Sequence, residues 1–191
     1  IKSFEKICKK TQSEVKTYVT ARLRETHQNI TVADGFVYAQ GTFPVLLIAH
    51  MDTVHKVLPY FILTSKDEKG NKKLSSPSGI GGDDRCGIYM IFEVLKKFNC
   101  SVLFCEDEEI GCIGATKFTE HPISENLTFN YIIEFDRKGN NDAVFYDCDN
   151  EEFEKFITKE FFKTAWGTMS DISVVDKAPK VEGRSMTMFL A

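Results

Sequence analysis

Five consecutive apolar residues, Val45–Ala49, limit how this chain can fold more than any other feature. An uninterrupted apolar run of this length is typical of a strand that is buried on both faces of its sheet. Such a sheet must be covered by helices on both sides. The rest of the chain agrees, because strand-like and helix-like segments alternate along it. We therefore expect an α/β sandwich built around a mixed sheet.

Hydrophobic periodicity and turn residues indicate the other elements. Phe4, Ile7, Val15 and Val19 have the spacing of one amphipathic helix, or of two, within residues 4–24. Asp34-Gly35 separates two β-rich runs and predicts a tight hairpin, because Gly tolerates the positive φ of the turn. Further helices are expected after Asp84 through Phe98 and over residues 113–118 and 151–162; further strands are expected at residues 30–33, 36–39, 61–63, 101–105, 129–135, 142–146 and 172–175 and around Leu74.

Composition argues against several classes of protein. The 191 residues include 24 basic and 28 acidic side chains, and the net charge of −4 does not favour binding to nucleic acid. No apolar run approaches the ~20 residues that a membrane-spanning helix needs. The lysine-rich N-terminus has no apolar stretch after it, so we expect no signal peptide. The six cysteines form no CxxC pair and predict reduced thiols in the cytoplasm.

Acidic and imidazole side chains stand beside expected strands and loops at four places. In chain order these are His50-Met51-Asp52, Asp83-Asp84, Glu108-Glu109 and Asp136. Three of them follow an expected strand, and Asp83-Asp84 follows a glycine-rich loop and opens a helix. Binding sites in open α/β sheets form beyond the carboxyl ends of the strands. All four clusters can therefore meet at one edge of the sheet.

Each cluster taken alone also has an ordinary structural explanation. A His-x-Asp sequence can form a surface hydrogen bond, and two aspartates before a helix can cap it. The acidic run over residues 106–109 can be a solvated charge patch. Asp136 can pair with the neighbouring Arg137. Four such coincidences in this order are harder to account for than one shared site.

A hydrolytic site with two metal ions requires this combination of side chains. Carboxylate oxygens and imidazole nitrogens suit Zn²⁺, Mn²⁺ or Co²⁺. One carboxylate must bridge two ions roughly 3.5–4 Å apart, and another must stay off the metal to move protons. Glu108 and Glu109 can divide such roles between them. Asp52 can hydrogen-bond the second nitrogen of His50 and fix its tautomer.

These residues carry a resemblance to a known superfamily. The segment Leu46–Val54 (LLIAHMDTV) resembles the first metal motif of the di-zinc exopeptidases, which include peptidase T, aminoacylase and glutamate carboxypeptidase. Gly82–Gly87 (GDDRCG) resembles the bridging-aspartate motif of that superfamily. Glu108–Gly111 (EEIG) resembles its Glu-Glu-x-Gly motif, and Ile133–Asp136 (IEFD) resembles the segment with the next acidic ligand. The similarity covers residues 42–136 and, more weakly, 167–173.

The resemblance implies a role for each matching residue. The metal ligands would be His50, Asp83, Glu109 and Asp136. Asp83 would bridge the two ions, with His50 and Asp136 on one ion and Glu109 on the other. Glu108 would be the catalytic base, and Asp52 would complete the catalytic pair by orienting His50.

The resemblance also implies a fold and an activity. The fold would be a three-layer α/β/α sandwich around a mixed, mostly parallel sheet. The chain would be a metallo-exopeptidase of aminopeptidase or tripeptidase type that cleaves short peptides at a terminus, using a metal-activated water. Its cofactor would be zinc, as one or two divalent ions, with Mn²⁺ or Co²⁺ as alternatives. An N-acyl amino acid deacylase or amidohydrolase is the alternative enzyme.

The sequence departs from the superfamily pattern in two ways. Too few residues separate Asp136 from Ser170 to form the lid or dimerisation domain of many relatives, so residues 1–191 are expected to be a single catalytic domain. The last metal ligand of the superfamily is a histidine near the C-terminus, and none follows His121. One intact metal subsite and one incomplete subsite, the one at Glu109, are therefore expected. An inactive binding protein is the alternative outside enzymes.

A few residues remain with weaker expectations. Arg137 and Ser170 are candidate substrate contacts, although Arg137 can equally pair with a neighbouring acid. His27, His55 and His121 are expected at the surface. The expected partner is a short peptide, with no nucleic acid and no membrane, and the sequence leaves a homo-oligomer open.

Overall fold

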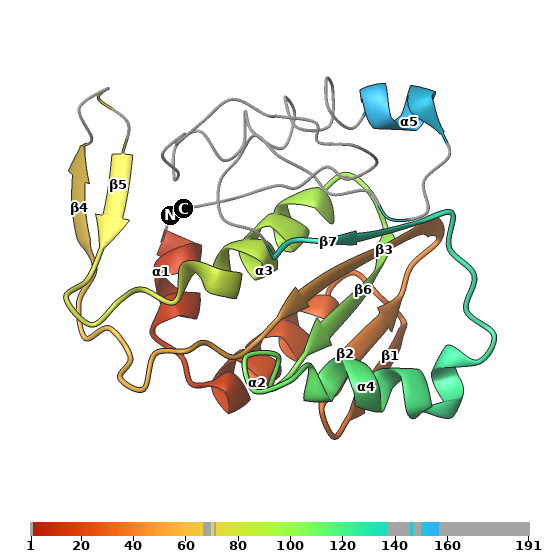
Figure 1. The fold of residues 1–191 in the computed structure, drawn as a ribbon, viewed down its shortest axis with the longest axis horizontal. Helices are drawn as coiled ribbons and strands as arrows, with labels where there is room; N and C mark the ends of the chain where they lie inside the picture. Colours follow the sequence, from red (N-terminus) through yellow and green to blue (C-terminus); the bar gives the residue numbers. More distant parts are fainter. Residues whose placement is uncertain (1, 67–69, 71, 137–145, 147–149, 157–191) are drawn as a thin grey trace. The chain divides into compact units, whose positions relative to one another are not determined.

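The computed structural model describes residues 2–66, 70, 72–136, 146 and 150–156 (Figure 1). They belong to two compact units. The first unit comprises Ile1–Tyr60 and Ser78–Phe135, and the second comprises Phe61–Pro77 and Asp136–Ala191. Because residues 157–191 are not among those described, the expectation of a single domain over the whole chain stays a prediction.

A five-stranded mixed sheet forms the centre of the first unit, in the order β1-β2-β6-β3-β7. Its strands are β1 (Asn29–Ala33), β2 (Phe36–Gln40), β3 (Phe43–His50), β6 (Cys100–Cys105) and β7 (Tyr131–Glu134). The first three in spatial order pair antiparallel, whereas β3 runs parallel to both of its neighbours, β6 and β7. The buried run that the sequence indicated therefore lies between two strands, as a strand apolar on both faces should.

The hairpin predicted at Asp34-Gly35 joins β1 to β2. The register pairs Ala33 with Phe36, which leaves a loop of two residues. Gly35 has a φ of 90°, in the left-handed region that residues with a Cβ rarely adopt. The local sequence alone was sufficient to predict this element.

Helices cover both faces of the sheet, in three layers. They are α1 (Lys2–Cys8), α2 (Gln12–Leu23), α3 (Gly82–Val94), α4 (Ile113–Glu120) and the short 3-10 helix η1 (Pro122–Ser124). On one face, Phe92 of α3 packs against Phe104 of β6 and Tyr18 of α2, with ring centroids 5.7 and 6.1 Å apart. On the other, Phe118 of α4 packs 5.2 Å from the ring of Phe36. Alternate residues of a strand face opposite sides, so both faces contribute to the core.

The helix α2 begins at a capping box. Thr11 accepts a hydrogen bond from the N–H of Glu14, and the carboxylate of Glu14 accepts one from the N–H of Thr11. These bonds satisfy backbone donors that the first turn of a helix leaves without partners. The start of α2 is thus fixed by local sequence, and Gln12 is its first residue.

Two expectations about individual residues are wrong. The helix expected through Phe98 ends at Val94, and Phe98 is 47% exposed, with its ring against that of Phe43. His27, expected at the surface, is buried, and its Nε2 lies 2.8 Å from the carbonyl oxygen of Cys100. His55 is exposed as expected, and His121 is half-buried.

The second unit contains an antiparallel hairpin of β4 (Leu63–Lys66) and β5 (Lys72–Ser75), and the helix α5 (Glu151–Phe156). The strand expected at residues 61–63 therefore begins two residues later. The strand expected at residues 142–146 lies outside the described part except for Tyr146. The strand at 172–175 and the remainder of the helix to 162 also lie outside it.

Two further findings concern the chain as described. The cysteines in these residues form no disulfide with one another. Among the helices described, none combines the length and apolar character that crossing a membrane requires.

Replacing Phe36 tests the core on the α4 face. Phe36 is fully buried against Phe118, so Phe36→Ala should lower the free energy of unfolding by about 3–5 kcal/mol. Phe98→Ala is the matched control, because the same atoms are removed from a half-exposed site, and it should cost about 1 kcal/mol. Urea unfolding followed by circular dichroism measures both; equal losses would contradict the packing described.

Candidate metal centre

The parallel pairing of β3 and β6 brings two of the predicted clusters together. His50, the last residue of β3, is paired with Cys105, the last residue of β6. The N–H of Met51 donates to the carbonyl oxygen of Cys105 at 2.7 Å, which extends the pairing past the end of the strand. The loop after β6, residues 106–112, therefore starts beside His50. This is the edge at which sites of open α/β sheets form.

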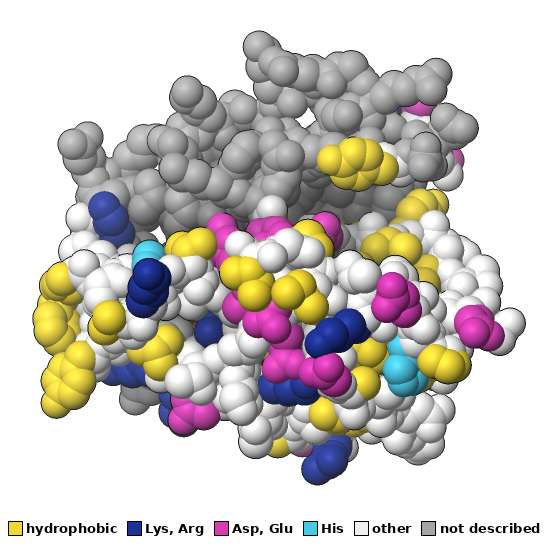
Figure 2. All heavy atoms as spheres, turned by 60° about the horizontal axis from the view of Figure 1, so that its bottom comes forward, with side chains coloured by type: hydrophobic (Ala, Val, Ile, Leu, Met, Phe, Trp, Pro, Cys, Tyr) yellow, Lys and Arg dark blue, Asp and Glu magenta, His cyan; other side chains and the backbone are white. Residues whose placement is uncertain are grey.

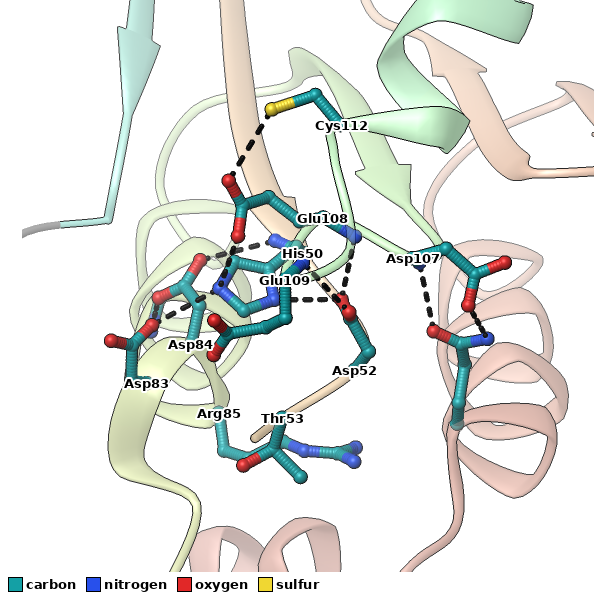
Figure 3. Close-up of polar contacts among 12 residues, drawn as sticks. His50, Asp52, Thr53, Asp83, Asp84, Arg85, Asp107, Glu108, Glu109 and Cys112 are labelled. Atoms are coloured by element: carbon teal, nitrogen blue, oxygen red, sulfur yellow. Dashed lines mark hydrogen bonds and ion pairs between the residues drawn. The ribbon is translucent and has the colours of Figure 1, made fainter. Parts of the chain in front are cut away.

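The imidazole of His50 is buried and has a carboxylate at each nitrogen (Figure 3). Its Nδ1 lies 2.9 Å from Oδ1 of Asp52, and its Nε2 lies 3.0 Å from Oδ1 of Asp83. Oε2 of Glu108 is 3.9 Å from the same Nε2. When Nδ1–H donates to Asp52, the neutral ring presents the lone pair of Nε2 as a ligand.

Asp52 connects His50 to the loop after β6. Besides the His50 contact, its carboxylate accepts hydrogen bonds from the N–H groups of Glu108 at 3.1 Å and Glu109 at 3.0 Å. Burial by itself would raise the pKa of Asp52, but the hydrogen bonds from His50 and from these two N–H groups outweigh it, so the pKa is lowered. Asp52 is therefore an ionised acceptor that holds imidazole and loop together.

The adjacent aspartates at the start of α3 have different partners. Asp83 is the exposed member, and it reaches Nε2 of His50. Asp84 is buried; its Oδ1 accepts from the N–H of Gly87 at 2.9 Å, and its Oδ2 accepts from the N–H of His50 at 3.2 Å. The helix-capping alternative therefore describes Asp84, whereas Asp83 stands at the candidate site. The peptide bond that joins them is cis.

Gly87 makes the fit around Asp84 possible. A Cβ at this position would lie 2.2 Å from Oδ1 of Asp84 and 2.5 Å from the carbonyl oxygen of Phe135. No side chain can be accommodated without moving one of them. Gly87 thus allows α3 to approach closely the backbone of Phe135, just after β7.

Three side chains in the first unit could hold a metal ion. Donor atoms of His50, Asp83 and Glu109 all lie within 4.8 Å of one another. Two ligands of one tetrahedral Zn²⁺, each ~2.0–2.1 Å from the ion, lie roughly 3.3 Å apart, which is close to the 3.0 Å between His50 and Asp83. One imidazole and two carboxylates are a donor set suited to Zn²⁺ and to similar divalent ions. The residues present therefore fit such an ion.

The electrostatics around Glu109 agree with a cation site. Burial raises the pKa of Glu109, and the negative charge of Asp83 raises it further, while His50 opposes the shift. Glu109 is thus a carboxylate held among other carboxylates, where a bound cation would relieve the repulsion. On the face drawn in Figure 2, acidic side chains gather in a band, with basic and hydrophobic side chains beside it.

Arg85 was not predicted from the sequence to have a role in the site. It is the basic residue of the GDDRCG segment, yet only 1% of it is exposed. Its Nη2 donates to the carbonyl oxygen of Lys10 at 3.2 Å. With Asp52 and Glu109 it lines a pocket of about 550 Å³. Its position on the helix face that also carries the buried Ile88, three residues on, was the available signal.

The roles of the other predicted site residues stay predictions. Asp136 is the first residue of the second unit, so its role as a metal ligand stays a prediction. Arg137 and Ser170 lie outside the described residues. Residues 157–191, among which there is no histidine, also lie outside them.

Changing Asp52 tests whether it orients His50. Asp52→Asn keeps the size of the side chain but leaves one acceptor oxygen for three donors, so Zn²⁺ affinity should fall ~10–100-fold. Asp34→Asn, which removes an exposed carboxylate paired with Lys117, should leave the affinity unchanged. Competition with a chromophoric chelator measures both values. An unaltered affinity in Asp52→Asn would remove Asp52 from the centre.

The comparisons with known proteins rest on structure. No model of a known protein family matches the chain, and no curated protein matches it. A tripeptidase from Staphylococcus aureus subsp. aureus Mu50 has a similar structure, with a TM-score of 0.54 and 18% identity over 74% of this chain and 44% of that one. The aminopeptidase PepT from Bacillus cereus ATCC 10987 is similar with a TM-score of 0.55 and 19% identity over 75% of this chain and 44% of that one.

This chain thus spans less than half the length of either peptidase. At such low identity the likeness concerns the fold. It confirms the α/β sandwich around a mixed sheet that the sequence predicted.

Proposed function

We propose that this chain is a metal-dependent hydrolase of the exopeptidase kind, which cleaves short peptides at a terminus. The observation that carries the proposal is the group formed by His50, Asp83 and Glu109, with Asp52 behind the imidazole. The fold shared with a tripeptidase and with an aminopeptidase supports it. We propose zinc as the cofactor, with Mn²⁺ or Co²⁺ as alternatives, because imidazole and carboxylate ligands suit these ions.

The ligands in this proposal are His50, Asp83 and Glu109, with Asp136 added on the strength of its motif. A bound divalent cation would supply Lewis-acid polarisation of the peptide carbonyl and activation of a water molecule. With Nδ1–H of His50 donating to Asp52, the imidazole would present its Nε2 lone pair to the cation. The chain also presents Glu109 on a loop whose backbone is bonded to the same carboxylate.

Glu108 is proposed as the group that moves the proton. Its N–H is bonded to Asp52, and its Oε2 lies 3.9 Å from Nε2 of His50, so the carboxylate is held beside the ligands. From there it can take the proton of the attacking water and deliver it to the amine that leaves when the C–N bond breaks. Cys112 donates a hydrogen bond from Sγ to the other oxygen, Oε1, at 3.4 Å.

Turnover of a small substrate panel tests the proposed function. The zinc-loaded chain should release an amino acid from dipeptides and tripeptides, and chelation should abolish the activity until metal is restored. N-acyl amino acids belong in the panel, because preference for them would assign the deacylase alternative. Failure to cleave any member with zinc bound, shown by elemental analysis, would leave a binding protein and overturn the proposal.

Glu108→Gln tests the proton-transfer role. The amide keeps the shape but cannot accept a proton, so kcat should fall by ~10²–10⁴ while the bound zinc per chain stays the same. Glu120→Gln is the matched control, at an exposed glutamate on α4, and should behave as the unchanged chain does. Steady-state kinetics and elemental analysis give the two readouts. Unchanged turnover would exclude Glu108 from the mechanism.

A further inference from the structure

One amide side chain on α2 holds the loop that carries Glu108 and Glu109. Nε2 of Gln12 donates to Oδ1 of Asp107 at 2.9 Å, and the N–H of Asp107 donates to Oε1 of Gln12 at 3.0 Å. The single side chain therefore bonds both the backbone and the side chain of the residue immediately before Glu108. Figure 3 marks both bonds at Asp107.

A second contact from the same helix supports the first. Lys16 is one turn after Gln12, so both side chains lie on the same side of α2. Its Nζ donates to the carboxylate of Glu106 and, at 2.7 Å, to the carbonyl oxygen of Ala33. The same Glu106 oxygen accepts from the N–H of Gly35 at 3.1 Å. The start of the loop is thus attached to α2 and to the β1–β2 turn.

The conformation held by Gln12 is one that the chain does not adopt readily. Asp107 has a φ of 57°, in the left-handed region, where aspartate and asparagine are tolerated better than other side chains but still at a cost. On the opposite side, Asp52 accepts hydrogen bonds from the N–H groups of Glu108 and Glu109. The loop is therefore fixed from two directions, by α2 and by the end of β3.

We propose that Gln12 is a positioning residue, which fixes the turn at Asp107 and thereby sets where the carboxylates of Glu108 and Glu109 lie. Only the expected effect of Gln12 on turnover rests on the proposed function. The contact itself is independent of the activity. Both hydrogen bonds of the Gln12 side chain go to Asp107, so we assign its effect on the centre to the loop.

The positioning role of Gln12 can be distinguished from an effect on the stability of α2. The first turn of α2 is capped by Thr11 and Glu14, and the amide of Gln12 takes no part in that capping box. Removing the amide should therefore leave α2 in place. Displacement of a proton-transfer group lowers kcat, whereas loss of uniform substrate binding raises KM.

The test uses the zinc-loaded chain and three variants. Gln12→Ala removes both bonds and should lower kcat ~10–100-fold with little change in KM or bound zinc. Gln12→Glu places a second carboxylate against Asp107 and should lower kcat at least as much. Combining Gln12→Glu with Asp107→Asn restores both bonds, because the new amide at 107 and the N–H of 107 can donate to the new carboxylate at 12. The net charge is unchanged, and kcat should recover.

Thr17→Ala is the matched control on the same helix. Thr17 is exposed, and its hydroxyl donates to the carbonyl oxygen of Ser13 within α2, away from the loop. The thermal midpoints of Thr17→Ala and Gln12→Ala should be similar, and only the latter should lose turnover. Equal kcat in the two variants, or a double variant no better than Gln12→Glu alone, would overturn the proposal.

Amide hydrogen exchange at Glu108 and Glu109 separates this inference from the proposed function. Both N–H groups are bonded to Asp52, so loosening the loop should speed their exchange ~10-fold or more in Gln12→Ala, and the double variant should restore it. If the unaltered chain cleaves no peptide, the proposed function fails, and exchange still decides the role of Gln12. Unaltered exchange in Gln12→Ala would overturn the role.

Discussion

The carboxylate of Asp52 is the contact on which the arrangement around His50 depends. It accepts from the imidazole and from two consecutive backbone N–H groups of the loop after β6. A largely buried carboxylate is stable in the ionised form only when such donors surround it. Because the three donors come from the end of β3 and from the loop after its neighbour β6, the positions of His50 and Glu109 are set together.

The sheet places these groups beside one another, and the carboxylates repel each other. Parallel pairing of β3 and β6 puts His50 opposite Cys105, so the loop after β6 begins beside His50. Carboxylates then gather within a few ångströms of each other, and the pKa of Glu109 is raised by burial and by Asp83. Such a cluster is unfavourable by itself and favourable around a cation, which is the physical basis for proposing a metal there.

Most of the fold could be predicted because its signals are local. The hairpin at Asp34-Gly35, the buried run of β3 and the helical character of the N-terminal segment depend on residue types within a few positions of one another. The errors have long-range causes. His27 is buried because its ring meets the carbonyl oxygen of Cys100, 73 residues away. Phe98 lies beyond the end of α3, against Phe43, although its spacing continued the helical period.

The sequence by itself determined which chemical groups stand at the strand ends and in what order, since strand patterns and motifs are read along the chain. Tertiary structure decided which side chains contact one another. It placed Asp83 against His50 and turned Asp84 to the backbone, buried Arg85, and brought Gln12 to a residue 95 positions later. No local period encodes such pairings, because they depend on where strands and helices pack once the sheet has formed.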